Sequence, residues 1–428
     1  MRFWGITGTN GKTTTTWITA EFINAAKDRK CGYVTTVEVN TGTRQFYTGY
    51  TTPPLKQLKE IFAEMEANGC TDCVMEVSSH AIHQHRTGDT VFSGGVFTNL
   101  SEDHLDYHKT MEAYFDVKLD FARQIAAAHP TTPDMGRRDL PPYVVCLDGG
   151  YGREMFNAVG NLAVNVIPVS AGKVVVGSRS RTMDVNDSTV RLGLSNYDLT
   201  DLQLVGDYNR SNVLCAAALA EAAGVPHAAI QAVIPTLKPR WGRLEEVYPS
   251  HDARSTKHKA RIFVDFAHTP DGLEKVLTAV RNEMRCQQSN NPPIERSNNS
   301  LWVVFGAGGD RDPMKRPLMG EACAKLADRL VVTSDNPRSE DPMAIINAIL
   351  VGVNRTIEHS EQSNNVFVEP DRAKAIALAL SRADEGDVVI IAGKGHETTQ
   401  EIKGVKHPFD DREVVRDFAG APCGREGA

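Results

Sequence analysis

A glycine-rich stretch near the start of the chain, "GITGTNGKTTTT" at residues 5–16, has the residue types of a phosphate-binding loop. Its glycines let backbone N–H groups turn toward an anion after a strand that ends at Ile6 and Thr7, and a helix is expected to start at the threonines. Lys12 would reach the outer phosphates of a nucleotide, and Thr13 would offer a hydroxyl to Mg²⁺. The alternative is an ordinary glycine-rich turn whose lysine points into water. The order strand, Gly-Lys-Thr, helix favours the phosphate loop.

The spacing within this loop is unusual. The common phosphate-loop pattern has four residues between its first glycine and the Gly-Lys-Ser/Thr element, whereas only Thr9 and Asn10 stand between Gly8 and Gly11 here. The loop is therefore a shortened form with the same physical logic. The residues predicted to contact the phosphates are Gly8, Thr9, Asn10, Gly11, Lys12, Thr13 and Thr14.

Two further residues could serve a metal site. Glu76 ends an apolar run, where an unneutralised charge is costly, and its carboxylate is the hard oxygen ligand that Mg²⁺ prefers. Lys118 lies among apolar side chains on an expected helix, where burial without a partner would depress its pKa. On spacing alone, a lysine that reaches out to the surface is the simpler interpretation of Lys118. The residues leave that choice open.

A group of histidines follows Glu76, and zinc binding is one alternative for it. No matching carboxylate pair accompanies the histidines, so hydrogen-bonding scaffold is the favoured interpretation. Asn99 and Asn209 are expected to hold either loop geometry or substrate, and the sequence does not separate these roles. The histidines concerned are His80, His83, His85 and His108.

The elements that position these residues form an α/β pattern, in which short apolar runs alternate with helical periodicity, at residues 55–66 and 111–125 for example. The pattern predicts largely parallel sheets, whose ligands gather beyond the carboxyl ends of the strands. Residues 126–142 and 285–300 are predicted to be solvated surface loops. The predicted strands are residues 73–77, 95–98, 143–147 and 163–169, then 261–265, 301–305, 330–333 and 388–392.

The composition is that of an ordinary globular protein, with 41% hydrophobic and 24% charged residues. A formal net charge of −7 argues mildly against nucleic-acid binding. The eight scattered cysteines indicate buried thiols in a reducing compartment. The sequence has no run of eighteen apolar residues and no signal-peptide core, so no membrane association and a cytoplasmic location are expected.

The motifs along the chain resemble those of the Mur ligase family, which includes folylpolyglutamate synthetases. The resemblance is closest to the branch that adds the third peptide residue to UDP-N-acetylmuramoyl-L-alanyl-D-glutamate. It covers nearly the whole chain and implies a central ATP-binding domain (1–237) with a mainly parallel sheet and a Rossmann-like C-terminal amino-acid-binding domain (238–428). The motifs are "GTNGKTT", "TTP" at 51–53, "EVSSHAIHQHR" at 76–86, "FTNLSEDHLDYH" at 97–108, "GDYNRSN" at 206–212, "GRLE" at 242–245, "DFAHTPDGLEKVL", "FGAGGDRDPMKRPLMG", "DNPRSEDP" and "AGKGHE".

The resemblance implies ATP-dependent amide formation through an acyl phosphate, in peptidoglycan precursor synthesis, with ATP and Mg²⁺. It implies that Lys118 is carbamylated and that Lys12, Glu76, His104 and Lys118 are catalytic. The implied metal ligands are Thr13, Glu76, His104 and carbamylated Lys118, and the implied nucleotide contacts from the second half are Arg243 and Asp265.

The resemblance also places the two substrates that are joined. Arg338 would pair with a distal carboxylate that lysine lacks, which favours meso-diaminopimelate, and Glu397 suits the distal ammonium. The alternatives are surface roles for Arg86 and Arg338. The implied acceptor residues are Thr51, Thr52, Ser78, Gln84 and Arg86. The implied amino-acid pocket consists of Arg311, Asp335, Asn336, Arg338, Gly393 and Glu397.

Members of this branch carry a further domain before the phosphate loop, which grips UDP, and we expect it to be absent here. Four interpretations follow. A D-glutamyl peptide on UDP-N-acetylmuramate is the acceptor, with or without a helper chain that replaces this domain. The enzyme instead acts on a smaller carboxylate without UDP, or is a non-catalytic nucleotide-binding regulator, or is a folylpolyglutamate synthetase. The motif "DNPR" and the acceptor motifs disfavour the last, and the retained metal residues disfavour the regulator.

Overall fold

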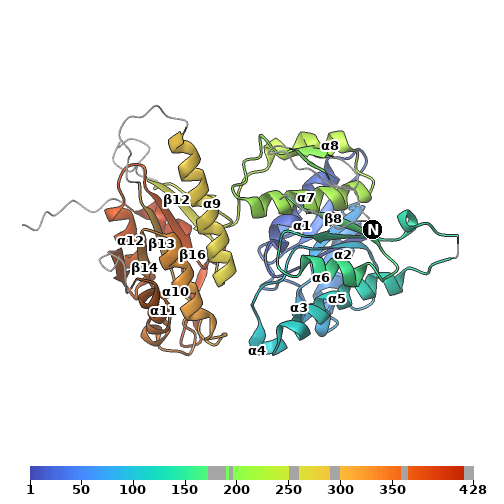
Figure 1. Cartoon of the computed structure of the whole chain (residues 1–428). Helices are drawn as coiled ribbons and strands as arrows, with labels where there is room; N and C mark the ends of the chain where they lie inside the picture. The colour runs from blue at the N-terminus through green and yellow to red at the C-terminus, as the bar shows by residue number, and fades with distance from the viewer. Residues whose placement is uncertain are drawn as a thin grey trace, which may run out of the picture. The chain divides into compact units, whose positions relative to one another are not determined.

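The computed structural model describes residues 1–132, 134–171, 189–191, 196–249, 260–289, 299–357 and 365–418. It divides into two compact units, Met1–Lys238 and Pro239–Ala428. Each unit is a layered α/β structure whose main sheet is mostly parallel and is flanked by helices (Figure 1). The predicted fold class is therefore confirmed.

The first unit contains an eight-stranded sheet in the order β4-β3-β2-β5-β1-β6-β7-β8. The strands from β2 to β8 in this order run parallel, and β3 and β4 extend the edge in antiparallel fashion. Strand β1 lies between β5 and β6, so the loop that follows it emerges at the middle of the sheet. The strands are β1 Arg2–Thr7, β2 Cys31–Val34, β3 Val39–Asn40, β4 Gln45–Phe46, β5 Asp72–Glu76, β6 Phe92–Phe97, β7 Pro142–Cys146 and β8 Asn165–Val169, with the separate pair β9 Thr189–Arg191 and β10 Asn196–Asp198.

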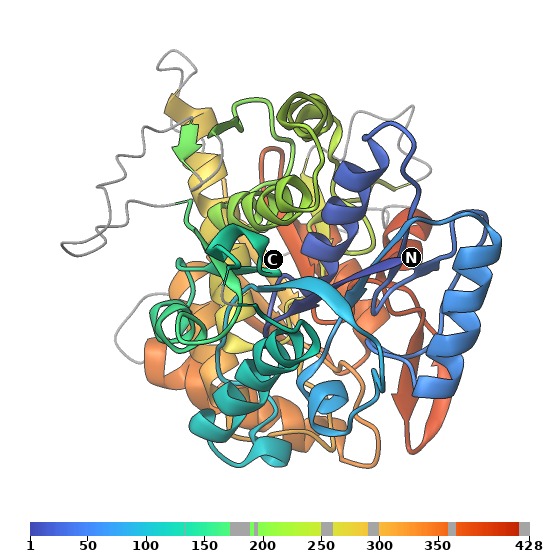
Figure 2. The same cartoon turned by 90° about the vertical axis from the view of Figure 1, so that its right-hand side faces the viewer.

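Helices cover both faces of this sheet. Helices α1 and α7 lie side by side on one face (Figures 1 and 2). On the other face, Met65 of α2, Phe121 of α5 and Met155 of α6 share one core with strand residues such as Met75. The helices are α1 Lys12–Asn24, α2 Leu55–Ala67, α3 Ser79–His83, α4 Leu105–His108, α5 Met111–Ala128, α6 Gly152–Val159, α7 Asp207–Ala222 and α8 His227–Val233, and the short 3₁₀ helices are Arg137–Asp139 and Ile234–Thr236.

The second unit contains a six-stranded sheet in the order β11-β12-β16-β13-β14-β15, parallel except at β11. Strands β12, β13, β14 and β16 are short apolar runs that are buried on both faces, as in parallel sheets generally. A separate antiparallel hairpin, β17–β18, follows β16. The strands are β11 Glu245–Glu246, β12 Arg261–Asp265, β13 Leu301–Phe305, β14 Arg329–Val332, β15 Val366–Val368, β16 Val388–Ala392, β17 Thr399–Ile402 and β18 Val405–Pro408.

Alternation along these strands sends side chains to opposite faces. Trp302, Val304 and Ile391 form one core with residues of α12 and α13. Residues between them, such as Val303 and Ile390, are also buried and point to the face where α10 packs between α9 and α11 (Figure 1). The helices are α9 Pro270–Ser289, α10 Lys315–Leu326, α11 Pro342–Ile357, α12 Arg372–Arg382 and α13 Asp411–Asp417.

Both segments predicted to be loops begin inside helices. Helix α5 continues to Ala128, and α9 continues to Ser289, so the loop prediction was wrong for these residues. Residues 137–139 also form a 3₁₀ turn. Polar composition led to the loop prediction, whereas the Ala, Arg and Gln residues at these positions are good helix formers. Residues 133 and 290–298 lie outside the described part of the chain.

Two simpler predictions concerned buried thiols and the lack of a membrane-spanning segment. Of the eight cysteines, the six whose side chains the structure describes are buried free thiols, as predicted: Cys31, Cys70, Cys73, Cys146, Cys215 and Cys323. Within the described ranges, every helix is too short or too polar to cross a membrane.

Candidate active site

The phosphate loop lies between β1 and α1 and requires its glycines. Gly8 has φ 149° and Gly11 has φ 84°, both in the region that favours glycine. A Cβ on Gly8 would lie 1.9 Å from Thr98 Oγ1, and one on Gly11 would lie 2.3 Å from Asn212 Oδ1. The loop therefore packs against its support without room for a side chain. Helix α1 begins at Lys12, so its N-terminal N–H groups face the same loop.

Neighbouring side chains hold the loop in place. The Asn99 side chain binds the backbone of Asn10 through two hydrogen bonds. Asn10 N donates to Asn99 Oδ1 at 3.0 Å, and Asn99 Nδ2 donates to Asn10 O at 3.0 Å. The Thr9 hydroxyl lies 3.1 Å from Tyr114 Oη and accepts a bond from Ser101 N. Of the two roles left open for Asn99, these contacts support loop geometry. Tyr114 and Ser101 were not predicted.

Two lysines meet at one carbonyl of the loop. Lys12 Nζ donates to Gly8 O at 3.0 Å and to Thr9 O at 2.8 Å, and Lys118 Nζ donates to Gly8 O at 2.8 Å. Lys118 is 1% exposed, and its ammonium lies 4.7 Å from the centre of the Tyr114 ring. Burial, and secondly the charge of Lys12, lower the pKa of Lys118 well below its ordinary value. Lys118 is thus a buried amine and not a surface lysine.

Glu76 lies at the end of β5, beside Ile6 of β1 in the sheet, and is 1% exposed. Both of its carboxylate oxygens face Thr36, which donates from its backbone N at 2.8 Å and from its hydroxyl at 3.1 Å. The Thr36 hydroxyl also lies 3.0 Å from Thr51 Oγ1. Glu76 is therefore fixed next to the phosphate loop and next to the first predicted acceptor residue. Thr36 was not predicted.

The remaining acceptor residues belong to the same network. Thr52 Oγ1 donates to Glu76 O at 2.8 Å and lies 3.3 Å from Ser78 Oγ, which caps α3. Arg86 donates from Nε to Gln84 Oε1 at 2.8 Å and from Nη1 to Thr52 O at 3.4 Å. The structure thus brings all five predicted acceptor residues together around the carboxyl end of β5.

His104 lies at the start of α4 with a positive φ of 56°. Its ring meets the His80 ring edge-on, with centroids 5.0 Å apart, and its Nε2 lies 3.5 Å from Asp103 Oδ2. Burial lowers the pKa of His104 to about 4, and the charge of Asp103 opposes this only in part. His104 is therefore neutral near pH 7, which is the form that binds a metal ion.

Among the described residues, no three His, Cys, Asp or Glu side chains cluster closely enough to hold a metal ion by themselves. The predicted ligand set contains two residues of these types, Glu76 and His104. Their chemistry fits Mg²⁺ in part, because Glu76 supplies a carboxylate and His104 is neutral, whereas an unmodified Lys118 is no ligand. His108 bonds to Ser79 at 2.9 Å and stacks on Tyr114, so it is built into the scaffold.

In the second unit, Asp265 ends β12 and binds backbone groups on both sides of that strand, before β11 and after β12. Its carboxylate accepts bonds from Leu244 N and Ala267 N, both at 2.7 Å. Burial raises the pKa of Asp265, although the positive charge of Arg243 acts in the opposite direction. The guanidinium of Arg243 lies 4.6 Å from the centre of the Phe266 ring. Both predicted nucleotide residues of this unit thus lie together beside the end of β12.

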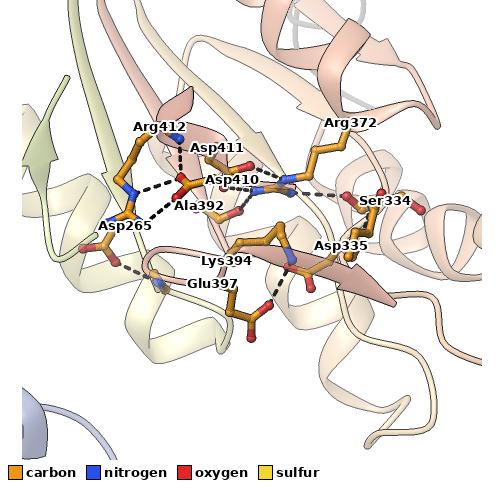
Figure 3. Close-up of polar contacts among 12 residues, drawn as sticks. Asp265, Ser334, Asp335, Arg372, Ala392, Lys394, Glu397, Asp410, Asp411 and Arg412 are labelled. Atoms are coloured by element: carbon orange, nitrogen blue, oxygen red, sulfur yellow. Dashed lines mark hydrogen bonds and ion pairs between the residues drawn. The ribbon is translucent and has the colours of Figure 1, made fainter. Parts of the chain in front are cut away.

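Four of the predicted amino-acid-binding residues, Asp335, Asn336, Gly393 and Glu397, meet beyond β14 and β16 near the buried Lys394. Figure 3 shows Asp335, Lys394 and Glu397 of this group. Lys394 Nζ donates to Glu397 Oε2 at 2.9 Å, to Asn336 Oδ1 at 3.3 Å and to Thr399 O at 2.6 Å. Asn336 Nδ2 donates to the same Glu397 oxygen at 2.8 Å. A Cβ on Gly393 would lie 2.4 Å from Asp335 Oδ2. Lys394 was not predicted to take part.

The two predicted pocket arginines flank Gly308. A Cβ on Gly308 would lie 3.0 Å from Arg338 Nη1 and 3.6 Å from Arg311 Cγ. Arg338 donates to Gly309 O at 2.5 Å, and its Nε lies 3.8 Å from Glu401 Oε2. Two cationic side chains that can bind a carboxylate therefore lie at the same edge of the sheet as Glu397.

A fully buried ion pair lies next to this edge of the sheet (Figure 3). Arg372 of α12 donates to both oxygens of Asp411, at 2.8 and 2.7 Å, and both side chains are 0% exposed. The same guanidinium donates to Ala392 O at 2.9 Å and to Ser334 O at 3.3 Å. It thereby ties the segment after β14 to the end of β16. The single sequence carries no signal for this pair.

The fold and the site define a nucleotide-binding α/β enzyme with a phosphate loop in one unit and a polar pocket in the other. Comparison of the sequence with models of protein families identifies the family. Residues 6–220 match the Mur ligase middle domain, and residues 242–395 match the Mur ligase glutamate ligase domain. The chain belongs to the Mur ligase family, whose members are ATP-dependent ligases that form amide bonds. The predicted family and ligase class are confirmed.

Individual proteins similar to this chain include diaminopimelate ligases and a folylpolyglutamate synthase. The chain is 38% identical to a UDP-N-acetylmuramoyl-L-alanyl-D-glutamate–2,6-diaminopimelate ligase of Synechococcus elongatus, over 97% of this chain and 76% of that protein. A solved structure of a ligase of the same name is 31% identical, with a TM-score of 0.57, and the match covers 97% of this chain and 77% of that one. The Mycobacterium tuberculosis folylpolyglutamate synthase, solved with ADP and AMPPCP, shares the fold at 18% identity, a TM-score of 0.58 and coverage of 92% and 88%.

Proposed function

We propose that this chain is an ADP-forming ligase that joins meso-diaminopimelate to the D-glutamyl carboxylate of UDP-N-acetylmuramoyl-L-alanyl-D-glutamate. The names of the similar ligases support this substrate pair. The observation that carries the amino-acid part is the pair of arginines around Gly308 at the same edge as Glu397. A distal carboxylate would pair with the arginines and a distal ammonium with Glu397, and only a diamino diacid offers both.

The proposed reaction has two steps. The acceptor carboxylate attacks the γ-phosphorus of ATP, an acyl phosphate forms, and ADP leaves. The neutral amine of the amino acid then attacks the acyl carbon, the C–O bond to phosphate breaks, and the amine loses a proton as the amide forms. Lys12, the N–H groups of the phosphate loop and the N-terminus of α1 would bind the phosphoryl oxygens as charge builds on them.

We further propose that Lys118 is carbamylated. The neutral amine would attack CO₂, a new N–C bond would form, and one proton would leave, so that a cation becomes an anionic carbamate. The buried position and lowered pKa of Lys118 support this step, because only the neutral amine is nucleophilic. The carbamate would join Thr13, Glu76 and His104 in holding Mg²⁺, which would neutralise phosphate charge and orient the phosphates.

The acceptor would be held by the network around Thr51, Thr52, Ser78, Gln84 and Arg86. These side chains offer hydroxyl, amide and guanidinium groups to a peptide carboxylate. Recognition of the UDP part, a helper chain for it and a location in the cytoplasm stay predictions. The relatives lend the helper chain no support.

ADP release in a matrix of acceptors and amino acids tests the proposal. The acceptors are the UDP-muramoyl dipeptide, the free dipeptide and simple glutamyl compounds, and the amino acids are meso-diaminopimelate and lysine. We expect ADP with the UDP-muramoyl dipeptide and meso-diaminopimelate. Turnover of the free dipeptide alone would favour a ligase for a carboxylate without UDP, and no ADP with any pair would refute the proposal.

A further inference from the structure

Two loops at the carboxyl edge of the second sheet are cross-linked by side chains that the proposed chemistry does not use. One loop, residues 306–311, follows β13 and carries Arg311. The other, residues 335–340, follows β14 and carries Arg338. The cross-links come from a buried arginine at the start of α10 and from three side chains of the loops themselves. They bear directly on where the two pocket arginines lie.

The centre of the cross-link is the ion pair between Arg316 and Glu340. Arg316 is 5% exposed and binds Glu340 through two bonds, Nη1 to Oε2 at 2.9 Å and Nη2 to Oε1 at 2.7 Å. Glu340 Oε1 also accepts a bond from Asp310 N at 2.6 Å. A parallel two-point pair between Arg and a carboxylate fixes orientation as well as distance. Glu340 is thereby anchored to α10 and to the neighbouring loop at once.

A second set of bonds connects the loops directly. The Asp310 carboxylate accepts bonds from the Ser339 hydroxyl at 2.5 Å and from Ser339 N at 3.2 Å. Gly309 N donates to Asn336 O at 2.9 Å. A Cβ on Gly309 would lie 1.9 Å from Pro337 O, so the two backbones touch. Either loop can therefore move only together with the other.

Both loops hold a strained residue at this junction. Asp310 and Arg338 each have φ 51°, in the left-handed region that residues other than glycine seldom occupy. Such conformations persist where the surrounding structure over-determines them. Here the backbone of Arg338 is also bonded on both sides to the β17–β18 region, N to Glu401 O at 3.0 Å and O from Lys403 N at 2.6 Å. The junction is therefore built at a cost in strain and is held by many contacts.

The cross-link reaches Arg338 through a single peptide group. Gly309 O and Asp310 N–H belong to the same planar trans peptide, so they point in opposite directions. Glu340 binds the N–H side of this peptide, and Arg338 Nη1 donates to its carbonyl side at 2.5 Å. The orientation of that peptide thus sets where the Arg338 guanidinium lies. The ion pair at Arg316 controls the orientation through Glu340.

We infer that Arg316, Glu340, Asp310 and Ser339 form a clamp that positions Arg338, and with it the preference for an amino acid bearing a distal carboxylate. The inference rests on the proposed function, because it assigns the clamp to the diaminopimelate pocket. Arg316 and Glu340 are positioning residues, since they act through Gly309 and Arg338 and need not touch the substrate. Loosening the clamp leaves the phosphate loop of the other unit intact.

Glu340→Gln tests the clamp, because glutamine fits the same space and removes the charge that holds Arg316. We expect the KM for meso-diaminopimelate to rise about tenfold, the size of one weakened charged hydrogen bond, and the KM for ATP to stay unchanged. The preference for meso-diaminopimelate over lysine should fall by a similar factor. Ser339→Ala, which removes one exposed bond to Asp310, should change the same two quantities in the same direction by a smaller factor.

The matched control is Glu321→Gln on α10, the helix that carries Arg316, where Glu321 pairs with Lys325 at 2.6 Å on the surface. It should change none of these constants. If wild-type protein turns over meso-diaminopimelate but Glu340→Gln keeps the wild-type preference, the clamp is refuted while the proposed function stands. An equal rise in both KM values also refutes the clamp. If the wild-type protein itself does not use meso-diaminopimelate, the proposed function fails and the clamp falls with it.

Discussion

Two lysines and a histidine of the first unit lie close to the phosphate loop. Lys12 and Lys118 share the Gly8 carbonyl, and burial lowers the pKa of Lys118. His104 is kept neutral close by, since burial lowers its pKa to about 4. Lys12 therefore lies beside a buried amine whose pKa is lowered and near a neutral imidazole, which is the form of histidine that binds a metal ion.

Replacement of Lys118 tests whether it acts as a metal-binding carbamate. Lys118→Ala should lower ligation at least about 10²-fold, as loss of one transition-state-stabilising group commonly does. Added chloride salts should not restore activity, whereas small carboxylates should restore part of it. Initial rates of ADP release measure this, with Lys56→Ala on the exposed face of α2 as the control. Full activity of Lys118→Ala would contradict the role.

Arg338 is expected to decide between meso-diaminopimelate and lysine. Arg338→Asn removes the guanidinium, and asparagine tolerates the positive φ at this position. The ratio of kcat/KM for meso-diaminopimelate to that for lysine should fall about 10- to 100-fold, the range of one or two charged hydrogen bonds. Lys403→Asn is a matched control, because Lys403 is also cationic, has φ 49° and is exposed. Unchanged discrimination in Arg338→Asn would refute the assignment.

At the scale of elements, the strands carry the site. Residues 261–265, 301–305 and 388–392 were predicted as strands, and the structure has them with the same bounds. They could be predicted because strands buried on both faces appear as unbroken apolar runs. Strands β15 and β17 were not predicted, because they are short and their side chains are largely polar or half-exposed. Such strands depend on tertiary partners that local sequence does not show.

The site shows the same difference between residues that local sequence reveals and residues that depend on distant partners. Glycines, Lys12 and the motif carboxylates could be predicted because their chemistry needs those residue types at fixed short spacing. Thr36, Lys394 and Arg372 could not, since each acts on a partner far along the chain. Their partners lie 40, 58 and 39 residues away, and one sequence does not pair them.

Asp72 connects β5 to β1 and to the segment before β2, and its replacement tests this packing. Its buried carboxylate accepts bonds from Trp4 Nε1 at 2.9 Å and from Arg29 Nε at 3.0 Å. Burial alone would raise the pKa of Asp72, but hydrogen bonds from Arg29, Trp4 and Thr71 outweigh it and lower the pKa. Asp72→Asn should lower the free energy of unfolding by about 3 kcal/mol at pH 7, because Arg29 loses a buried partner.

The sign of the pH dependence follows from the lowered pKa. The contribution of ionised Asp72 is present above its unfolded-state pKa, near 3.8, and is lost as the pH falls through the lower folded-state value. Thermal unfolding between pH 7 and pH 3 should therefore show a shallower acid-side loss of stability in Asp72→Asn than in wild type. Asp120→Asn, at an exposed pair with Arg123, should change stability by less than about 1 kcal/mol. Equal changes in both variants would contradict the assignment.

At the scale of the whole molecule, the two units carry different parts of the proposed reaction. The first unit holds the phosphate loop and the residues proposed to bind the acceptor, and the second holds the residues proposed to bind the amino acid and the proposed clamp. The chain spans 76% of the length of the Synechococcus relative that it matches. Both family models match, so the middle domain and the glutamate ligase domain of the family are present in one chain.

The most direct test of the central claim follows oxygen from the acceptor carboxylate. With ¹⁸O in the D-glutamyl carboxylate of the UDP-muramoyl dipeptide, an acyl phosphate leaves one labelled oxygen in phosphate when the amine attacks. We expect one ¹⁸O in inorganic phosphate for each amide formed with meso-diaminopimelate, as measured by mass spectrometry. Unlabelled phosphate, or labelled phosphate without the tripeptide product, would contradict the proposed ligation.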